Sequence, residues 1–144
     1  MKRRSAQLNG MRRVYLVASE LCRLGFIASP TSRGALGADI LVTDQECKET
    51  FSIQVKTNAS TTFAFWLLTK KARTMASPNY IYVFVNIRNR KGVESIEYYI
   101  VPSAIVAKKM VSGTTKNKKR AWKEWHQFNI PDAKPYLNDW SPIT

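Results

Sequence analysis

The stretch FSIQVKT, residues 51–57, decides how the rest of the chain is interpreted. Apolar and polar residues alternate along it, which is the pattern of a β-strand with one side in a core. The apolar side consists of Phe51, Ile53 and Val55, and the other side carries Ser52, Gln54 and Lys56. An amide and a lysine inside a small sheet indicate either solvent exposure or a functional site.

The preceding segment ADILVT, residues 38–43, predicts an antiparallel partner strand joined through DQECKE. Pairing Thr43 with Thr50 gives a register in which the apolar residues of both strands share one face. A slip of one residue would move every side chain to the wrong face, so this agreement favours the register. The apolar pairs that it predicts are Val42 with Phe51, Ile40 with Ile53 and Ala38 with Val55.

The opposite face of this hairpin collects the polar residues. The register places Asp39 directly across from Gln54, at a Cβ separation of roughly 5 Å, and diagonally across from Lys56, at about 7–8 Å. We therefore expect an acid, an amide and an ammonium group to meet at one end of the hairpin.

A helix is predicted from Ser5, a candidate N-cap, to about Leu24, and Gly25 is suited to end it. Glu20 lies on this helix in a stripe with Leu16, Val17 and Leu24. A carboxylate is costly to bury without a partner. We expect a metal ion or Lys56 to compensate Glu20.

The rest of the chain predicts a helix over residues 65–76, a hairpin of strands 80–87 and 94–101, and a helix over 104–111 closed by Gly113. The resulting order is α-β-β-β-α-β-β-α. We predict one α/β domain over residues 1–144, with a central mixed β-sheet flanked by helices.

Three segments together resemble the PD-(D/E)XK nuclease superfamily, which includes restriction endonucleases and Holliday-junction resolvases. They are E-L-x-x-L-G-F from Glu20, G-A-D-I-L-V from Gly37, and I-Q-V-K-T from Ile53. The later YYIVPSAIV is similar to a strand-then-helix segment of small members. The resemblance implies a restriction-endonuclease-like core.

The same resemblance implies catalytic roles for Glu20, Asp39, Gln54 and Lys56 in hydrolysis of DNA phosphodiester bonds. It implies Mg²⁺, or Mn²⁺ in its place, held by Asp39, Gln54, Glu20 and the carbonyl of Val55. Gln54 stands where an acid is usual, so the metal site has one negative charge fewer. The alternative is a catalytically inactive nucleic-acid-binding module on the same fold.

The charge of the chain favours a polyanionic partner. There are 23 Lys and Arg against 10 Asp and Glu, a net charge of +13. DNA attracts such a field strongly. Residues 108–123 hold seven basic residues and no acid, and the first 13 residues hold five. From these clusters we predict phosphate contacts by Arg12, Arg13, Lys116, Lys118, Lys119 and Arg120.

Aromatic residues interleave with the second basic cluster. Burial in a C-terminal layer is favoured over base stacking for them, because indole rings bury a large area. They are Trp122, Trp125, Phe128, Tyr136 and Trp140.

Several further expectations follow from composition. No apolar run is long enough to span a bilayer, and no signal peptide is evident, so no membrane association is expected. Two cysteines outside any ligand spacing favour reduced thiols in the cytoplasm. Cutting both strands of a duplex calls for two sites, so a homodimer is possible by analogy with the family. A basic structural protein without any site is a third reading of the charge.

Overall fold

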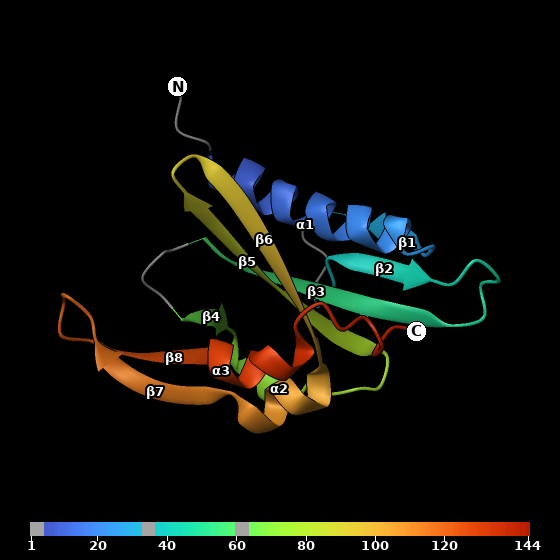
Figure 1. Ribbon diagram of the computed structural model, residues 1–144. Coiled ribbons are helices and arrows are strands. Elements are labelled where there is room, and N and C mark those ends of the chain that lie inside the picture. Colours follow the sequence, from blue (N-terminus) through green and yellow to red (C-terminus); the bar gives the residue numbers. More distant parts are fainter. Residues whose placement is uncertain (1–4, 33–36, 60–63) are drawn as a thin grey trace.

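The computed structural model describes residues 5–32, 37–59 and 64–144. The elements are α1 (Ala6–Arg23), β1 (Ile27–Pro30), β2 (Ile40–Thr43), β3 (Thr50–Asn58), β4 (Phe65–Leu68), η1 (Lys70–Arg73), β5 (Tyr80–Arg90), β6 (Val93–Pro102), α2 (Ser103–Lys109), β7 (Val111–Lys116), β8 (Trp122–Asn129), α3 (Ile130–Ala133) and η2 (Lys134–Tyr136). Figure 1 shows their arrangement.

The main sheet has five strands in the order β1-β2-β3-β5-β6. All neighbours are antiparallel except β3 and β5, which are parallel, so the sheet is mixed as predicted. The β2–β3 ladder has the predicted register, with Ile40 opposite Ile53 and Thr43 opposite Thr50. The ladder ends at Ile40, however, so the expected strand pairing of Ala38 with Val55 does not form.

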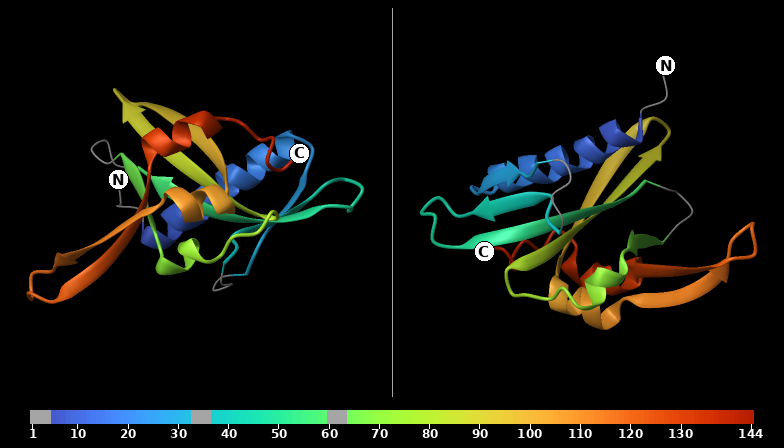
Figure 2. Two further views of the ribbon diagram at one scale, coloured as in Figure 1. Left: turned by 90° about the horizontal axis from the view of Figure 1, so that it is seen from below. Right: turned by 180° about the vertical axis from the view of Figure 1, so that it is seen from behind.

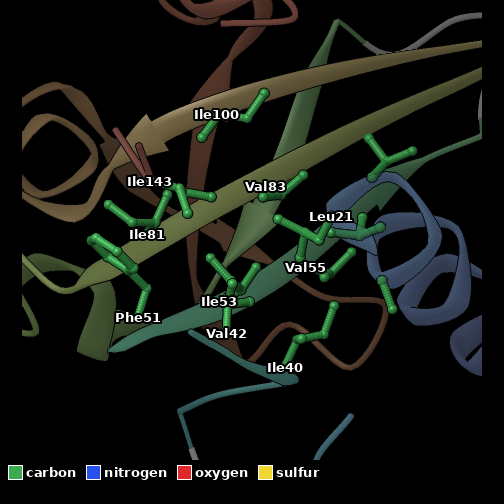
Figure 3. Packing of buried hydrophobic residues seen from close by; sticks show 13 residues of the cluster. Leu21, Ile40, Val42, Phe51, Ile53, Val55, Ile81, Val83, Ile100 and Ile143 are labelled. Atoms are coloured by element: carbon green, nitrogen blue, oxygen red, sulfur yellow. The ribbon is translucent and has the colours of Figure 1, made fainter. Parts of the chain in front are cut away.

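One face of the main sheet packs against α1. Val17, Ala18 and Leu21 of the helix are buried against the odd-numbered residues of β3 and against β2, β5 and β6 (Figure 3). The helix begins at the predicted cap, because the Ser5 hydroxyl accepts a hydrogen bond from the Leu8 N–H at 3.2 Å. Among the described residues, no helix has an apolar stretch long enough to cross a membrane.

The other face of the main sheet packs against a second layer, formed by a three-stranded sheet of order β4-β8-β7 together with α2 and α3 (Figures 1 and 2). Aromatic rings fill the space between the layers. Trp66 is buried, lies 4.9 Å from Phe84 between ring centroids, and donates its indole N–H to the Val85 carbonyl at 2.9 Å.

The predicted helix over residues 65–76 is wrong: this segment forms β4 and the short 3-10 helix η1. Burial alternates along β4, with Trp66 and Leu68 inside and Leu67 outside. Its partner is β8, where Phe65 pairs with Asn129 some 60 residues later, and a local pattern cannot reveal such a partner. The predicted order therefore lacked β4, β7 and β8. The helix expected over 104–111 is α2, and Gly113 lies in β7 instead of closing a helix.

Replacing Ile53 by alanine tests the core beside the polar end of the hairpin. Ile53 is fully buried on β3, and its truncation leaves a cavity, so Ile53→Ala should lower the free energy of unfolding by about 2–5 kcal/mol. Urea denaturation monitored by circular dichroism measures the change. Val93→Ala removes apolar atoms from a 71% exposed side chain and should change stability by less than about 0.5 kcal/mol. Equal effects of the two substitutions would contradict this packing.

Candidate active site

Asp39 precedes β2 and is held from both sides by backbone hydrogen bonds. Its N–H donates to the Ile53 carbonyl at 2.8 Å, and its carbonyl accepts from the Thr31 N–H at 2.9 Å. The Thr31 hydroxyl also donates to the Ala38 carbonyl at 2.8 Å. These bonds fix the backbone from which the Asp39 carboxylate projects toward β3.

The Asp39 carboxylate takes the place of a strand partner for β3. Its Oδ2 accepts the Val55 N–H at 2.8 Å and the Gln54 side-chain amide at 2.8 Å. Val55 is almost fully buried, so leaving its N–H without an acceptor would destabilise the folded protein. The predicted meeting of Asp39 with Gln54 therefore exists, although the two residues lie just beyond the ladder.

Gln54 has both ends of its amide near polar groups. Its Nε2 points to Asp39, and its Oε1 lies 3.4 Å from the Tyr80 hydroxyl. Tyr80 thus favours the amide orientation in which nitrogen faces the carboxylate.

Lys56 is half-buried on the same face of β3 as Gln54, two residues further along. Burial lowers the pKa of its ammonium group, the Asp39 carboxylate acts against this, and the Arg13 guanidinium adds to the lowering. Lys56 therefore lies in the field of Asp39, as the hairpin register predicts, and of a cation on α1.

Two hollows, of about 540 and 640 Å³, open around this group, and both include Asp39, Gln54 and Lys56. Among the described residues that line them, Asp39 is the sole acid, whereas the cations are Lys56, Arg13, Lys70 and Lys71. An excess of positive charge in a partly desolvated hollow suits a phosphate group.

The donor set for a divalent cation is small. Asp39 offers one carboxylate oxygen, Oδ1, that carries no hydrogen bond to the described residues, and the described part of the chain has no cluster of three His, Cys, Asp or Glu. The Val55 carbonyl faces the same strand edge as its N–H. Gln54 would present oxygen only with its amide reversed. This set fits an ion that keeps water and phosphate oxygens as ligands, which is common for Mg²⁺.

Glu20 is not among the residues that line the two hollows, so the structure adds no support to the role expected for it. Its carboxylate pairs with Arg23 at 2.9 Å. Burial raises the pKa of Tyr98 on β6, and the Glu20 carboxylate adds to that rise. The helix packs on the face opposite Gln54 and Lys56, and Arg13, near its N-terminus, lines the larger hollow. Glu20 is seven residues further on, about 10 Å along the axis.

The predicted phosphate-binding residues lie in two regions. Arg12 is held in an ion pair with Glu94, whereas Arg13 is exposed and reaches the hollows. The other four are exposed on the β7–β8 hairpin, away from Asp39: Lys116, Lys118, Lys119 and Arg120.

The sequence interpretation missed Lys70, Lys71 and Tyr80. The two lysines lie on the 3-10 helix η1, within residues 65–76, which were predicted to form an α-helix. Tyr80 lies on the site face because the parallel β3–β5 register pairs it with Ser52, as it pairs Tyr82 with Gln54. A parallel pairing of these two strands, assumed from the sequence, would have predicted the tyrosines.

Comparison with known proteins supports the fold. A solved structure of Hjc from Archaeoglobus fulgidus, a Holliday junction resolvase from an archaeal hyperthermophile, matches with a TM-score of 0.54 over 94% of each chain, at 14% identity. No protein-family model and no curated sequence matches the chain. The protein therefore has the restriction-endonuclease-like fold, as predicted.

Asp39 and Arg13 act in opposite directions on the pKa of Lys56, so substituting each should shift that pKa in a predictable direction. Asp39→Asn should lower the pKa of Lys56 further, because it removes the opposing carboxylate, and Arg13→Gln should raise it. Because the folded pKa lies below the unfolded value, the unfolded chain binds more protons between the two. Lys56 therefore makes folding more favourable as pH rises through that interval. NMR titration of ¹³Cε-labelled lysines measures these shifts, and shifts of the same sign in both variants would contradict the geometry.

Proposed function

We propose that the protein is a metal-dependent endonuclease that hydrolyses DNA phosphodiester bonds at Asp39, Gln54 and Lys56. The observation that carries the proposal is the 2.8 Å contact of Asp39 with Gln54 in a cation-rich hollow that also holds Lys56. Support comes from the fold that the chain shares with a Holliday junction resolvase. We further propose Mg²⁺, or Mn²⁺ in its place, as the cofactor.

The roles follow from position and charge. Arg13, Lys70 and Lys71 attract the DNA phosphates, and Lys56 contacts the scissile one. With its lowered pKa, the Lys56 amine takes a proton from the water that attacks phosphorus. As the new P–O bond forms, the old one breaks, and the leaving oxygen keeps its electron pair and is protonated from solvent. Asp39, the Val55 carbonyl and, with its amide reversed, Gln54 would hold the cation, which would neutralise charge on the phosphoryl oxygens.

A homodimer accords with this activity, because one such site cuts one strand at a time. The exposed thiols of Cys22 and Cys47 accord with a reducing compartment, and we propose the cytoplasm.

A second candidate function is DNA binding without cleavage. It is favoured by Gln54, because Asp39 is then the one carboxylate among the described residues that line the hollows. The Gln54 amide nitrogen, and not its oxygen, faces that carboxylate. Metal-dependent cleavage separates the two candidates.

Lys56→Ala and Asp39→Ala should each slow cleavage of supercoiled plasmid or a four-way junction by at least about 100-fold, because each removes a group acting on the attacking water or the cation. DNA affinity should persist. Gel assays in Mg²⁺ and in Mn²⁺ measure the rates. The matched control is Lys48→Ala, an exposed lysine paired with Glu46.

Glu20→Gln sharpens this test. If Glu20 were a metal ligand, the substitution would slow cleavage as much as Asp39→Ala does. Because Glu20 pairs with Arg23 instead, we expect only a small change in the cleavage rate. If the unaltered protein binds DNA and leaves it uncut in both metals, the endonuclease proposal fails and the binding candidate stands.

Gln54→Glu should strengthen Mg²⁺ binding to the free protein by roughly ten-fold or more, because it adds a second carboxylate. Without metal, the two acids repel, so the variant should melt at a lower temperature and recover on addition of Mg²⁺. Calorimetric titration and thermal melts measure both effects. A short DNA should narrow the difference from the native protein, since its phosphate supplies negative charge.

Gln45→Glu is the matched control, because Gln45 binds the Gly25 carbonyl away from the hollows. Tight Mg²⁺ binding by the native protein without DNA would contradict a cation site that is completed by the substrate.

A further inference from the structure

The β7–β8 hairpin extends from the body of the protein as an arm (Figures 1 and 2). We define the arm as residues 111–129. Its base is anchored because β4 pairs with the His126–Asn129 end of β8. The outer half of β8, from Trp122 to Trp125, pairs with β7 alone.

Close packing stiffens the outer half of the arm. Gly113 lies opposite Trp125 across the two strands. The indole ring covers the glycine so closely that a Cβ atom there would lie 2.3 Å from it. Isolated two-stranded ribbons are marginally stable in water, so this ring contact helps to keep the arm in one shape.

The turn at the tip, residues 117–121, is also ordered. The Asn117 side chain accepts the backbone N–H groups of Lys119 and Ala121, each at 2.9 Å. The Asn117 N–H donates to the Ala121 carbonyl at 2.9 Å. The tip is therefore a defined loop that presents Lys118, Lys119 and Arg120 to solvent.

Positive charge is concentrated at this tip. Residues 116–123 contain five basic residues and no acid. Like charges this close repel one another unless a polyanion neutralises them, and DNA phosphates are spaced closely enough to do so.

A large aromatic ring is exposed among these charges. Trp122 is 68% exposed, so the predicted burial of these aromatic residues is wrong for Trp122. Phe128, at the base of the arm, is fully buried as predicted. The Lys116 ammonium lies 5.0 Å from the centroid of the Trp122 ring. An exposed indole beside cations provides a flat face for a nucleobase and positive charge for its phosphate.

We propose that the tip of the arm is a second DNA-binding site, which takes an unpaired nucleotide. The base stacks on Trp122, and Lys118, Lys119 and Arg120 contact the flanking phosphates. An unpaired base is required because paired bases in a duplex are already stacked and do not offer a free face to an indole. This proposal requires that the protein binds DNA, but it does not require that the protein cleaves DNA.

The arm also connects this site to the hollows. β8 leads from Trp122 to Phe128, which pairs with Trp66 of β4, and Trp66 and Leu67 line the larger hollow around Lys56. One pair of strands thus joins the two sites, so DNA held at the tip would lie on a structure that also borders Asp39 and Lys56. Substrates with a single-stranded portion near the scissile bond would be favoured.

Fluorescence anisotropy in EDTA tests the proposal, because it measures binding while metal-dependent cleavage is blocked. Trp122→Ala should weaken binding of a labelled single-stranded oligothymidylate by roughly 5- to 100-fold, the range for loss of one base–aromatic stack. A long blunt duplex of two complementary strands should lose less than about two-fold, because it contacts the arm through phosphates. A duplex with a single-stranded tail should follow the oligothymidylate.

Trp122→Phe should retain most of the affinity, since a phenyl ring still stacks. The matched control is Val93→Ala, a similarly exposed apolar residue at the tip of the β5–β6 hairpin, which should change nothing. Equal losses on single strand and duplex would overturn the unpaired-base assignment. No loss with Trp122→Ala, or a loss with Trp122→Phe as large as with alanine, would overturn the stacking site. Absence of nuclease activity would leave this result unaffected.

Discussion

A single interaction organises the polar end of the main sheet: the Asp39 carboxylate accepts the backbone N–H of Val55. β3 has nine residues but β2 pairs with only four of them, so a buried N–H beyond the ladder needs an acceptor. Asp39 supplies one with a side chain while its own backbone is fixed by Ile53 and Thr31. The bond that closes the ladder therefore also fixes a carboxylate beside Gln54 and Lys56, and the candidate site is a consequence of how the sheet ends.

The same constraint sets the electrostatics. With Oδ2 engaged by two N–H donors, the one acid of the hollows has a single oxygen left, and the surrounding cations outnumber it among the described residues. Under the proposed function, such a site would attract phosphate readily and a free divalent cation weakly. Phosphate binding and cation binding would then be coupled, with DNA supplying the negative charge that Gln54 lacks. The proposed contact of the arm with DNA would be separate from the hollows, because Lys118, Lys119 and Arg120 do not line them.

The sequence contained the β2–β3 register, because both strands are short, adjacent and alternate in polarity, and the meeting of Asp39, Gln54 and Lys56 followed from it. Features that depend on distant partners were not accessible. β4 was predicted as a helix because its partner β8 lies 60 residues away, and Lys70 and Lys71 were missed with it. The helix that carries Glu20 was predicted correctly, but a helical pattern does not reveal where along the sheet each turn of the helix lies. Trp122 is exposed because the arm extends beyond the end of β4. The local sequence does not reveal how far the arm extends.

In the proposed function, Asp39 holds a divalent cation only together with a DNA phosphate. Anomalous diffraction from Mn²⁺ tests it most directly, in crystals of the Lys56→Ala protein grown with and without a short DNA. We expect an anomalous peak within bonding distance of Asp39 Oδ1 in the DNA complex and none there in the free protein. A peak at Glu20 in place of Asp39, or equal peaks at Asp39 in both crystals, would contradict it.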